Sequence, residues 1–278
     1  MMSQAAFVGG DDGVFHPTEA ARSGWSADMV NGPALVGLAA ASLEDEYGQD
    51  GFLPARFTAD LFRAAHRVPT QVRTRVVRDG RRIRITECDI LQDGVAVARA
   101  DMVQYRLSGP PPGREWVSPD PGFAPPREVG RATTAYFVGS DDAGWAGSAG
   151  MGDGVHAHQN ASRKRVYHRT SEVVAGQPAS PFVRTVVAAE ATSLATNLGT
   201  KGIGYINGDL TVALSRLPVG DYIGLQADSH WCAAGVSVGS ATLCDDIGPF
   251  GIGMVTAIAN PAAQIDFGRL ESVPTLQV

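Results

Sequence analysis

The chain has 278 residues, 44% of them hydrophobic, with a formal net charge of −6 and a pI near 5.5. This composition excludes disorder of the whole chain, and the acidic balance gives no electrostatic reason to expect nucleic acid as a partner. No stretch approaches the roughly 18 apolar residues of a membrane span, and the first residues lack the pattern of a signal peptide.

Three cysteines, Cys88, Cys232 and Cys244, cannot all pair within one chain, and their spacing matches no zinc motif. Free thiols suit a reducing compartment. We therefore expect a cytoplasmic protein without a metal or another cofactor. The pair His156 and His158 has no third ligand nearby in sequence, and a solvated loop is its simpler interpretation.

In the first half, the sequence predicts short strands, then a helix, then a long antiparallel meander. Proline at a first helical position and Gly48 after the last one are typical helix boundaries. The meander alternates apolar and polar residues, with hairpin turns at Asp79-Gly80 and Asp93-Gly94. The expected strands cover residues 6–9, 14–18, 52–62, 70–78, 81–91 and 95–107, and the helix covers residues 34–48.

Seven of the 17 prolines lie between Pro110 and Pro126, where their fixed φ and missing N–H groups oppose regular structure. This stretch predicts a linker over residues 109–132. It divides the chain into an N-terminal unit, residues 1–108, and a C-terminal unit, residues 133–278.

The second half repeats the order of elements in the first, with a glycine-rich loop over residues 139–162. Ser180 and Pro181 are the expected N-cap and first turn of a helix that continues to about Asn197. The expected strands cover residues 134–138, 163–174, 205–216, 222–229, 235–244 and 250–260.

A long helix beside four antiparallel strands is buried most economically when the curved sheet wraps around the helix. The predicted fold class is therefore α+β, a double hotdog of two long helices, each wrapped by a curved antiparallel sheet. Side-by-side packing of the two units would join their sheets and cover strand edges. An edge left exposed would favour a homodimer.

Glu190 is the main candidate for chemistry. Phe182, Val186, Glu190 and Leu194 follow one another at i+4 spacing on the stripe expected to face the core. A buried carboxyl there would have a raised pKa and could act as a general base toward water. A structural glutamate bonded to strand groups is the alternative.

Two asparagines offer amide groups near helix ends. Asn207 begins the strand that follows the second helix, where it could orient water or stabilise an oxyanion, or form a turn. Asn31 and Gly32 at the first helix could direct free N–H groups toward a carbonyl, or only start the helix.

The stretches SPFVRTVVAAEATSLATNLG, INGDLTVALSRLPVG and GVSVGSATLCDDIGPFGIG resemble the C-terminal hotdog of the acyl-CoA thioesterase II family. The stretches MVNGPALVGLAAASLE and GFLPARFTADLFRAA, followed by VRTRVVRDGRRIRITECDILQDGVAVARA, resemble its N-terminal hotdog. The resemblance implies hydrolysis of an acyl-CoA, or a related acyl thioester, by a water molecule that an acidic residue activates.

The same resemblance places the family's acidic residue at Glu190, its hydroxyl at about Asn207 and its glutamine at about Val255, beside Thr256. The expected catalytic residues are Glu190, Asn207 and Thr256, and the expected substrate-binding residues are Asn31, Gly32 and Thr211. The family's histidine before the first helix is replaced by Val30. Because several polar positions differ, a catalytically silent acyl-thioester-binding or scaffold protein is an alternative, and a hotdog dehydratase or other tailoring enzyme is another.

Overall fold

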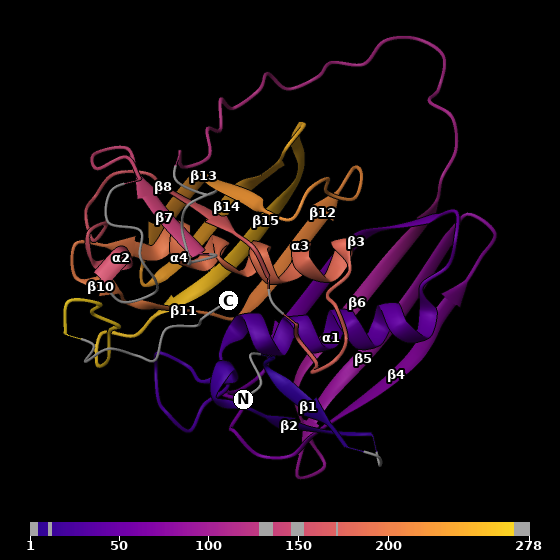
Figure 1. Ribbon diagram of the computed structural model, residues 1–278, viewed down its shortest axis with the longest axis horizontal. Helices are drawn as coiled ribbons and strands as arrows, with labels where there is room; N and C mark the ends of the chain where they lie inside the picture. Colours follow the sequence, from indigo (N-terminus) through magenta and orange to yellow (C-terminus); the bar gives the residue numbers. More distant parts are fainter. Residues whose placement is uncertain (1–4, 11–12, 128–135, 146–152, 171, 270–278) are drawn as a thin grey trace.

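The computed structural model describes residues 5–10, 13–127, 136–145, 153–170 and 172–269. Within these residues, no helix is both long and apolar enough to cross a membrane. The chain forms one long curved sheet with helices on one of its faces (Figure 1).

The first half contains one long helix, α1 (Gly32–Tyr47), which Asn31 caps at its start and Gly48 ends. Two short strands precede it and four long strands follow it. The last three of these form an antiparallel meander, but the first pairs with the last and not with its successor, so the four-strand meander that the sequence predicts is wrong in the place of its first strand. Asp93 and Gly94 have φ angles of 50° and 75°, as a tight hairpin turn requires. The strands are β1 (Phe7–Gly9), β2 (Val14–Pro17), β3 (Phe52–Leu61), β4 (Thr70–Asp79), β5 (Ile83–Gln92) and β6 (Val95–Arg106), with a short 3-10 helix at Glu19–Ala21.

The second half repeats this plan, but its helix is divided. α3 (Pro181–Glu190) is separated from α4 (Thr192–Asn197) by Ala191, so only α1 has the expected length. The remaining helix is α2 (Asp153–His156). The strands are β7 (Tyr136–Ser140), β8 (Lys164–His168), β9 (Leu198–Gly199), β10 (Gly202–Ile203), β11 (Tyr205–Asn207), β12 (Asp209–Leu214), β13 (Ile223–Ala233), β14 (Val236–Asp245) and β15 (Gly248–Ala259).

The two halves share one sheet, as the side-by-side arrangement predicts. Among the described residues it has 13 strands, in the order β1-β2-β4-β5-β6-β3-β12-β15-β14-β13-β8-β7, with β11 paired to β15. The halves meet where β3 pairs antiparallel with β12, with Thr58 opposite Thr211. This pairing covers an edge strand of each half, which would otherwise expose unpaired backbone groups.

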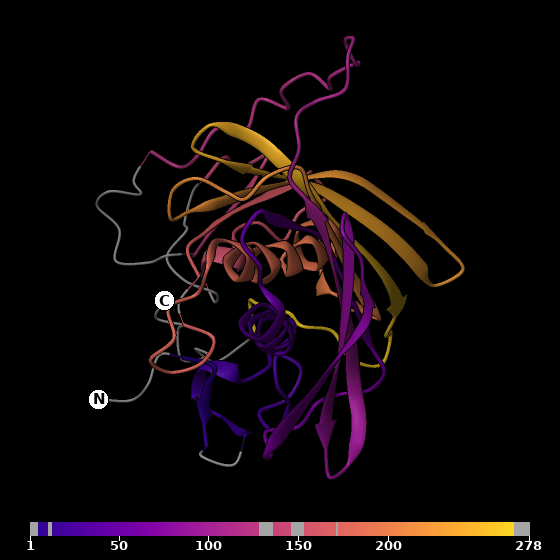
Figure 2. The same cartoon turned by 90° about the vertical axis from the view of Figure 1, so that its right-hand side faces the viewer.

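The helices pack against each other on the inner face of the sheet, which curves around them (Figure 2). α1 and α3 pack closely at Gly37, where a Cβ would lie 2.9 Å from Val187 of α3 and 3.0 Å from Val173, which precedes α3. Phe182 of α3 meets Phe57 of β3 edge to face, with ring centroids 6.2 Å apart. The core is therefore continuous between the halves.

The predicted linker has no helix or strand over residues 109–127, and its remaining part, residues 128–132, lies outside the described residues. Its end is attached to the outer face of the sheet. The Phe123 ring lies over Gly224 and stacks on Tyr167, and the Trp145 indole donates a hydrogen bond to the Ala124 carbonyl. Of the predicted glycine-rich loop, residues 139–140 belong to β7 and residues 146–152 lie outside the described part.

Candidate active site

Glu190 is the last residue of α3, on the stripe that faces the core. Val186 and Phe182, one and two turns earlier, are fully buried at 0% exposure, whereas Glu190 is partly exposed. The i+4 spacing therefore identifies the correct face of the helix. Part of the residue's surface is exposed, while its carboxyl lies against protein groups.

Gly32, the first residue of α1, lies against the Glu190 carboxyl. A Cβ on Gly32 would lie 2.7 Å from Cδ of Glu190 and closer still to Oε1. Real side chains do not approach this closely, so the contact requires glycine at this position. Because the first N–H groups of a helix have no intrahelical acceptor, the carboxyl lies at a ready donor site.

Asn207 contacts the same carboxylate from the sheet. Its Nδ2 donates to Oε1 of Glu190 over 3.4 Å. Asn207 ends β11 and is paired with Ala257, which is buried, so its side chain lies on the inner face of the sheet. The structure thus brings together three of the six residues that the sequence nominates: Glu190, Asn207 and Gly32.

Burial raises the pKa of Glu190 to about 8, and the hydrogen bond from Asn207 opposes this shift. Desolvation destabilises the charged form of a carboxyl, and a single amide donor compensates it only in part. At pH 7 roughly one carboxyl in ten is ionised. A carboxyl with a pKa near neutrality can accept a proton from water and later release it.

Tyr136 and His168 form an aromatic pair on the inner face of β7 and β8. They are opposite each other in register, with ring centroids 5.1 Å apart. Burial and the nearby Glu190 raise the pKa of Tyr136, and burial lowers the pKa of His168 to about 4. Both side chains are therefore uncharged at neutral pH, which maintains the low polarity around Glu190.

No motif in the sequence indicates that Tyr136 and His168 belong to the site. Tyr136 lies 54 residues before Glu190 in the chain, and no motif connects them. The strand expected at residues 134–138 provides the only local signal, because alternation places Tyr136 on the same face as the buried Val138. Nδ1 of His168 is buried and has no hydrogen-bond partner among the described residues.

Asn31 serves as the cap of α1. Its Oδ1 accepts from the Ala34 N–H over 2.8 Å, and its Nδ2 donates to the carbonyls of Ala20 and Arg22. With both side-chain groups engaged, Asn31 positions the helix start, and Gly32 makes the contact with Glu190.

Thr211 and Thr256 lie on the outer face of the sheet, away from the helices. Thr256 follows the buried Val255 on β15, and strand alternation directs it outward. Its N–H donates to Asp209 Oδ1 over 2.8 Å, and its hydroxyl donates to the other oxygen of the same carboxylate. The structure does not bring either threonine to Glu190.

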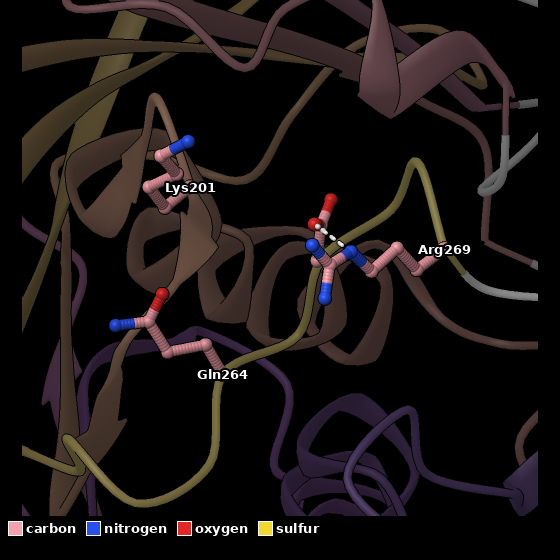
Figure 3. A pocket seen from close by; sticks show the side chains of 4 residues that line it. Lys201, Gln264 and Arg269 are labelled. Carbon is pink, nitrogen blue, oxygen red and sulfur yellow. Dashed lines mark ion pairs between the residues drawn. The ribbon is translucent and has the colours of Figure 1, made fainter.

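Two surface hollows lie elsewhere. One, of about 400 Å³, is lined by Lys201, Gln264, Asp266 and Arg269, with an ion pair of 3.3 Å between the last two (Figure 3). The other, of about 570 Å³, lies at the C-terminal end of α1 and includes Phe52, Arg84 and Arg106. Neither includes Glu190.

The described residues contain no group of three or more His, Cys, Asp or Glu side chains that could hold a metal ion. His158 is buried, with Nδ1 2.9 Å from the Ser140 hydroxyl, while His156 is exposed. The chemistry available at Glu190 is therefore that of a carboxyl, an amide, a backbone helix terminus and a neutral phenol.

Two family models together match most of the chain. The model of the acyl-CoA thioesterase N-terminal domain matches residues 21–104, and that of the C-terminal domain matches residues 109–254. No curated protein matches the chain in sequence.

Solved structures share the fold at low identity. The tesB protein of Mycobacterium avium subsp. paratuberculosis is 13% identical, with a TM-score of 0.65, over 92% of this chain and 96% of that one. The acyl-CoA thioesterase II TesB2 of Mycobacterium marinum is 13% identical, with a TM-score of 0.60, over 92% and 95%. A hot dog protein of Alicyclobacillus acidocaldarius is 14% identical, with a TM-score of 0.63, over 92% and 96%.

Proposed function

Since the chain belongs to the acyl-CoA thioesterase family, as the match to both of its domains shows, we propose that it hydrolyses an acyl-CoA or a related acyl thioester to a free acid and a thiol. The observation that carries this proposal is the Glu190 carboxyl, held between Gly32 and Asn207 with a pKa raised to about 8. A purely structural glutamate would be satisfied by stronger hydrogen bonds than the single long one observed here.

In the proposed reaction, the ionised Glu190 takes a proton from a water molecule while the water oxygen attacks the thioester carbonyl carbon. The C–S bond of the resulting tetrahedral adduct then breaks, and the leaving sulfur takes the proton that Glu190 removed from water, which gives the thiol and ionises Glu190 again. Asn207 orients the carboxylate through its amide. We assign stabilisation of the negative carbonyl oxygen to the free N–H groups at the start of α1, where Gly32 lies.

The proposal is tested by offering the purified protein acyl-CoAs of several chain lengths and following loss of the thioester absorbance. Wild type is expected to turn over, and Glu190→Gln is expected to lose at least 100-fold in kcat, the lower range for a general base. Saturable binding without hydrolysis would instead favour a silent acyl-thioester-binding protein, for which Val30, Asn207 and Val255 are the motivating departures from the family pattern. Loss or gain of water across a carbon–carbon bond would favour a dehydratase.

We also propose that the chain forms a homodimer through the outer face of its second half. There, neighbouring strands carry large apolar side chains whose exposed fractions lie between 37% and 68%. The Asp209 carboxylate on this face accepts hydrogen bonds from the N–H and the hydroxyl of Thr256. The same face of the first half carries ion pairs such as Arg75–Glu87 and Arg99–Asp89. The exposed apolar residues are Ile206, Trp231, Val236, Ile252, Met254 and Ile258.

A second copy of the chain fits this largely apolar face, because two such faces can bury their apolar side chains against each other. β13, β14 and β15, of 10 to 12 residues each, cover roughly 500 Å² given their usual spacing and rise, compared with about 800 Å² for one side of a standard interface. Light scattering should give twice the 29.1 kDa mass of the chain. Ile258→Asp should give monomers, and Val95→Asp, an exposed position in the first half, should not. A wild-type monomer would contradict the homodimer.

We also propose a cytoplasmic location, because Cys88, Cys232 and Cys244 are all free thiols and free thiols suit a reducing compartment. Fractionation of producing cells, with the protein followed by antibody, tests it. Recovery outside the cytoplasmic fraction would contradict it.

A further inference from the structure

α1 and α3 run antiparallel, and each end of the pair joins a glutamate of one helix to the start of the other. At one end, Glu190 of α3 lies against Gly32, the first residue of α1. At the other end, Glu44 of α1 accepts a hydrogen bond from the hydroxyl of Ser180, the N-cap of α3. The duplicated fold therefore contains the same kind of junction twice.

The two junctions differ in how fully they are bonded. At Glu190 the neighbour on α1 is a glycine, which has no side chain to form a hydrogen bond. The carboxyl accepts one hydrogen bond of 3.4 Å from the side-chain amide of Asn207. At the other junction, the Ser180 oxygen accepts from the Val183 N–H over 3.1 Å while its hydroxyl donates to Glu44. One hydroxyl thus connects the carboxylate of α1 to the backbone of α3.

Between the junctions the helices cannot slide without cost. Gly37 of α1 lies so close to Val187 of α3 that even a Cβ would be crowded, and close-packed side chains transmit a shift instead of absorbing it. An axial movement of α1 relative to α3 would therefore move Gly32 relative to Glu190. The Glu44–Ser180 bond opposes this movement at the end farthest from the site.

We propose that the Ser180–Glu44 hydrogen bond is a latch that fixes the register of α1 against α3 and thereby holds the Glu190 carboxyl against Gly32. Glu44 is in this view a positioning residue, since it does not touch Glu190 itself. The inference rests on the proposed function for its consequence in catalysis, but the position of Glu190 can be measured without any substrate.

The experiment is an NMR titration of glutamate side chains labelled with ¹³C at Cδ, in which Glu190→Gln identifies the Glu190 signal. Glu44→Ala removes the latch and should lower the midpoint of Glu190 from about 8 by about one pH unit, because the carboxyl is then less completely desolvated. Glu44→Gln keeps an acceptor for the Ser180 hydroxyl and should restore the wild-type midpoint. Asp45→Ala, which removes an exposed neighbour on α1, should leave it unchanged.

Glu44→Gln also separates the latch from a charge effect, because it removes the charge and keeps the bond. The 12 residues from Gly32 to Glu44 span about 18 Å of helix, beyond the Debye length at physiological salt, so direct coupling between the two carboxyls is weak. If Glu44→Ala does not fold, Glu44→Asp, which is one methylene shorter, removes the same contact.

A Glu190 midpoint that is the same in wild type and in the folded Glu44→Ala or Glu44→Asp variant would overturn the latch. If the Glu190 midpoint falls in Glu44→Gln as it does in Glu44→Ala, the cause is loss of the Glu44 charge and not loss of the hydrogen bond. That result would also overturn the latch. Failure of the proposed function is a separate result, since absence of thioester hydrolysis by wild type leaves the titration readable.

Discussion

Replacing Glu190 by glutamine should stabilise the protein, increasingly so as the pH rises. The folded-state pKa of Glu190, about 8, lies above the ordinary value of 4.5, so between these values the folded chain binds more protons than the unfolded one. Stability is therefore lost as the pH rises through this window. Glutamine keeps the shape of the side chain and an acceptor for Asn207 but does not ionise. The stability of the variant should therefore not fall with pH through this group.

The magnitude follows from the two pKa values. The free energy of unfolding that wild type loses through Glu190 is near zero at pH 4. It reaches at most about 3 kcal/mol at pH 7 and at most about 5 kcal/mol at pH 9, at 1.36 kcal/mol per pH unit. These are also the expected differences between Glu190→Gln and wild type. They are a substantial fraction of the 5–15 kcal/mol by which a folded domain is typically more stable than its unfolded chain.

The assay is urea unfolding followed by tryptophan fluorescence at pH 4.5, 7 and 9, at one fixed protein concentration because association also affects stability. Glu115→Gln, the same substitution in the exposed linker, is the matched control and should give no pH-dependent difference. A stability difference between wild type and Glu190→Gln that is constant across this range would refute a carboxyl held out of water.

Two further outcomes are expected. Gly32→Ala places a methyl group where the Glu190 carboxyl lies and should lower kcat at least tenfold, whereas Gly208→Ala, where a Cβ meets nothing within 4 Å, should be nearly silent in the same thioester assay. Equal activity of the two variants would contradict the contact. Of the free thiols, the exposed Cys232 should react with a disulfide reagent in the folded protein, while two buried thiols, with pKa values raised to about 12, should react only after unfolding.

The sequence could predict those elements that local chemistry specifies. Asp93-Gly94 is a hairpin turn because both residues adopt positive φ, and Asn31 and Gly48 bound α1 as a cap and a stop. The i+4 stripe that contains Glu190 also follows from the helix period alone. Each of these signals is complete within a few residues.

What the sequence could not predict depends on contacts between distant segments. Gly32 and Glu190 are 158 positions apart, so neither the contact nor the need for glycine is visible locally. The break at Ala191 has no glycine or proline to announce it, and α4 lies close to the sheet at Gly253. The resemblance predicts Thr256 as a catalytic residue because it stands beside Val255, the position of the family's glutamine. Val255 is buried, so strand alternation directs Thr256 to the outer face.

The most direct measurement is the pH dependence of thioester hydrolysis at saturating acyl-CoA, in wild type and in Glu190→Gln. Wild type should gain about tenfold in kcat per pH unit below pH 8 and level off above it, as expected for a base that must be ionised, and the variant should stay low throughout. A wild-type profile that is flat between pH 6 and 9, or a variant that retains the wild-type rate, would contradict Glu190 as the base.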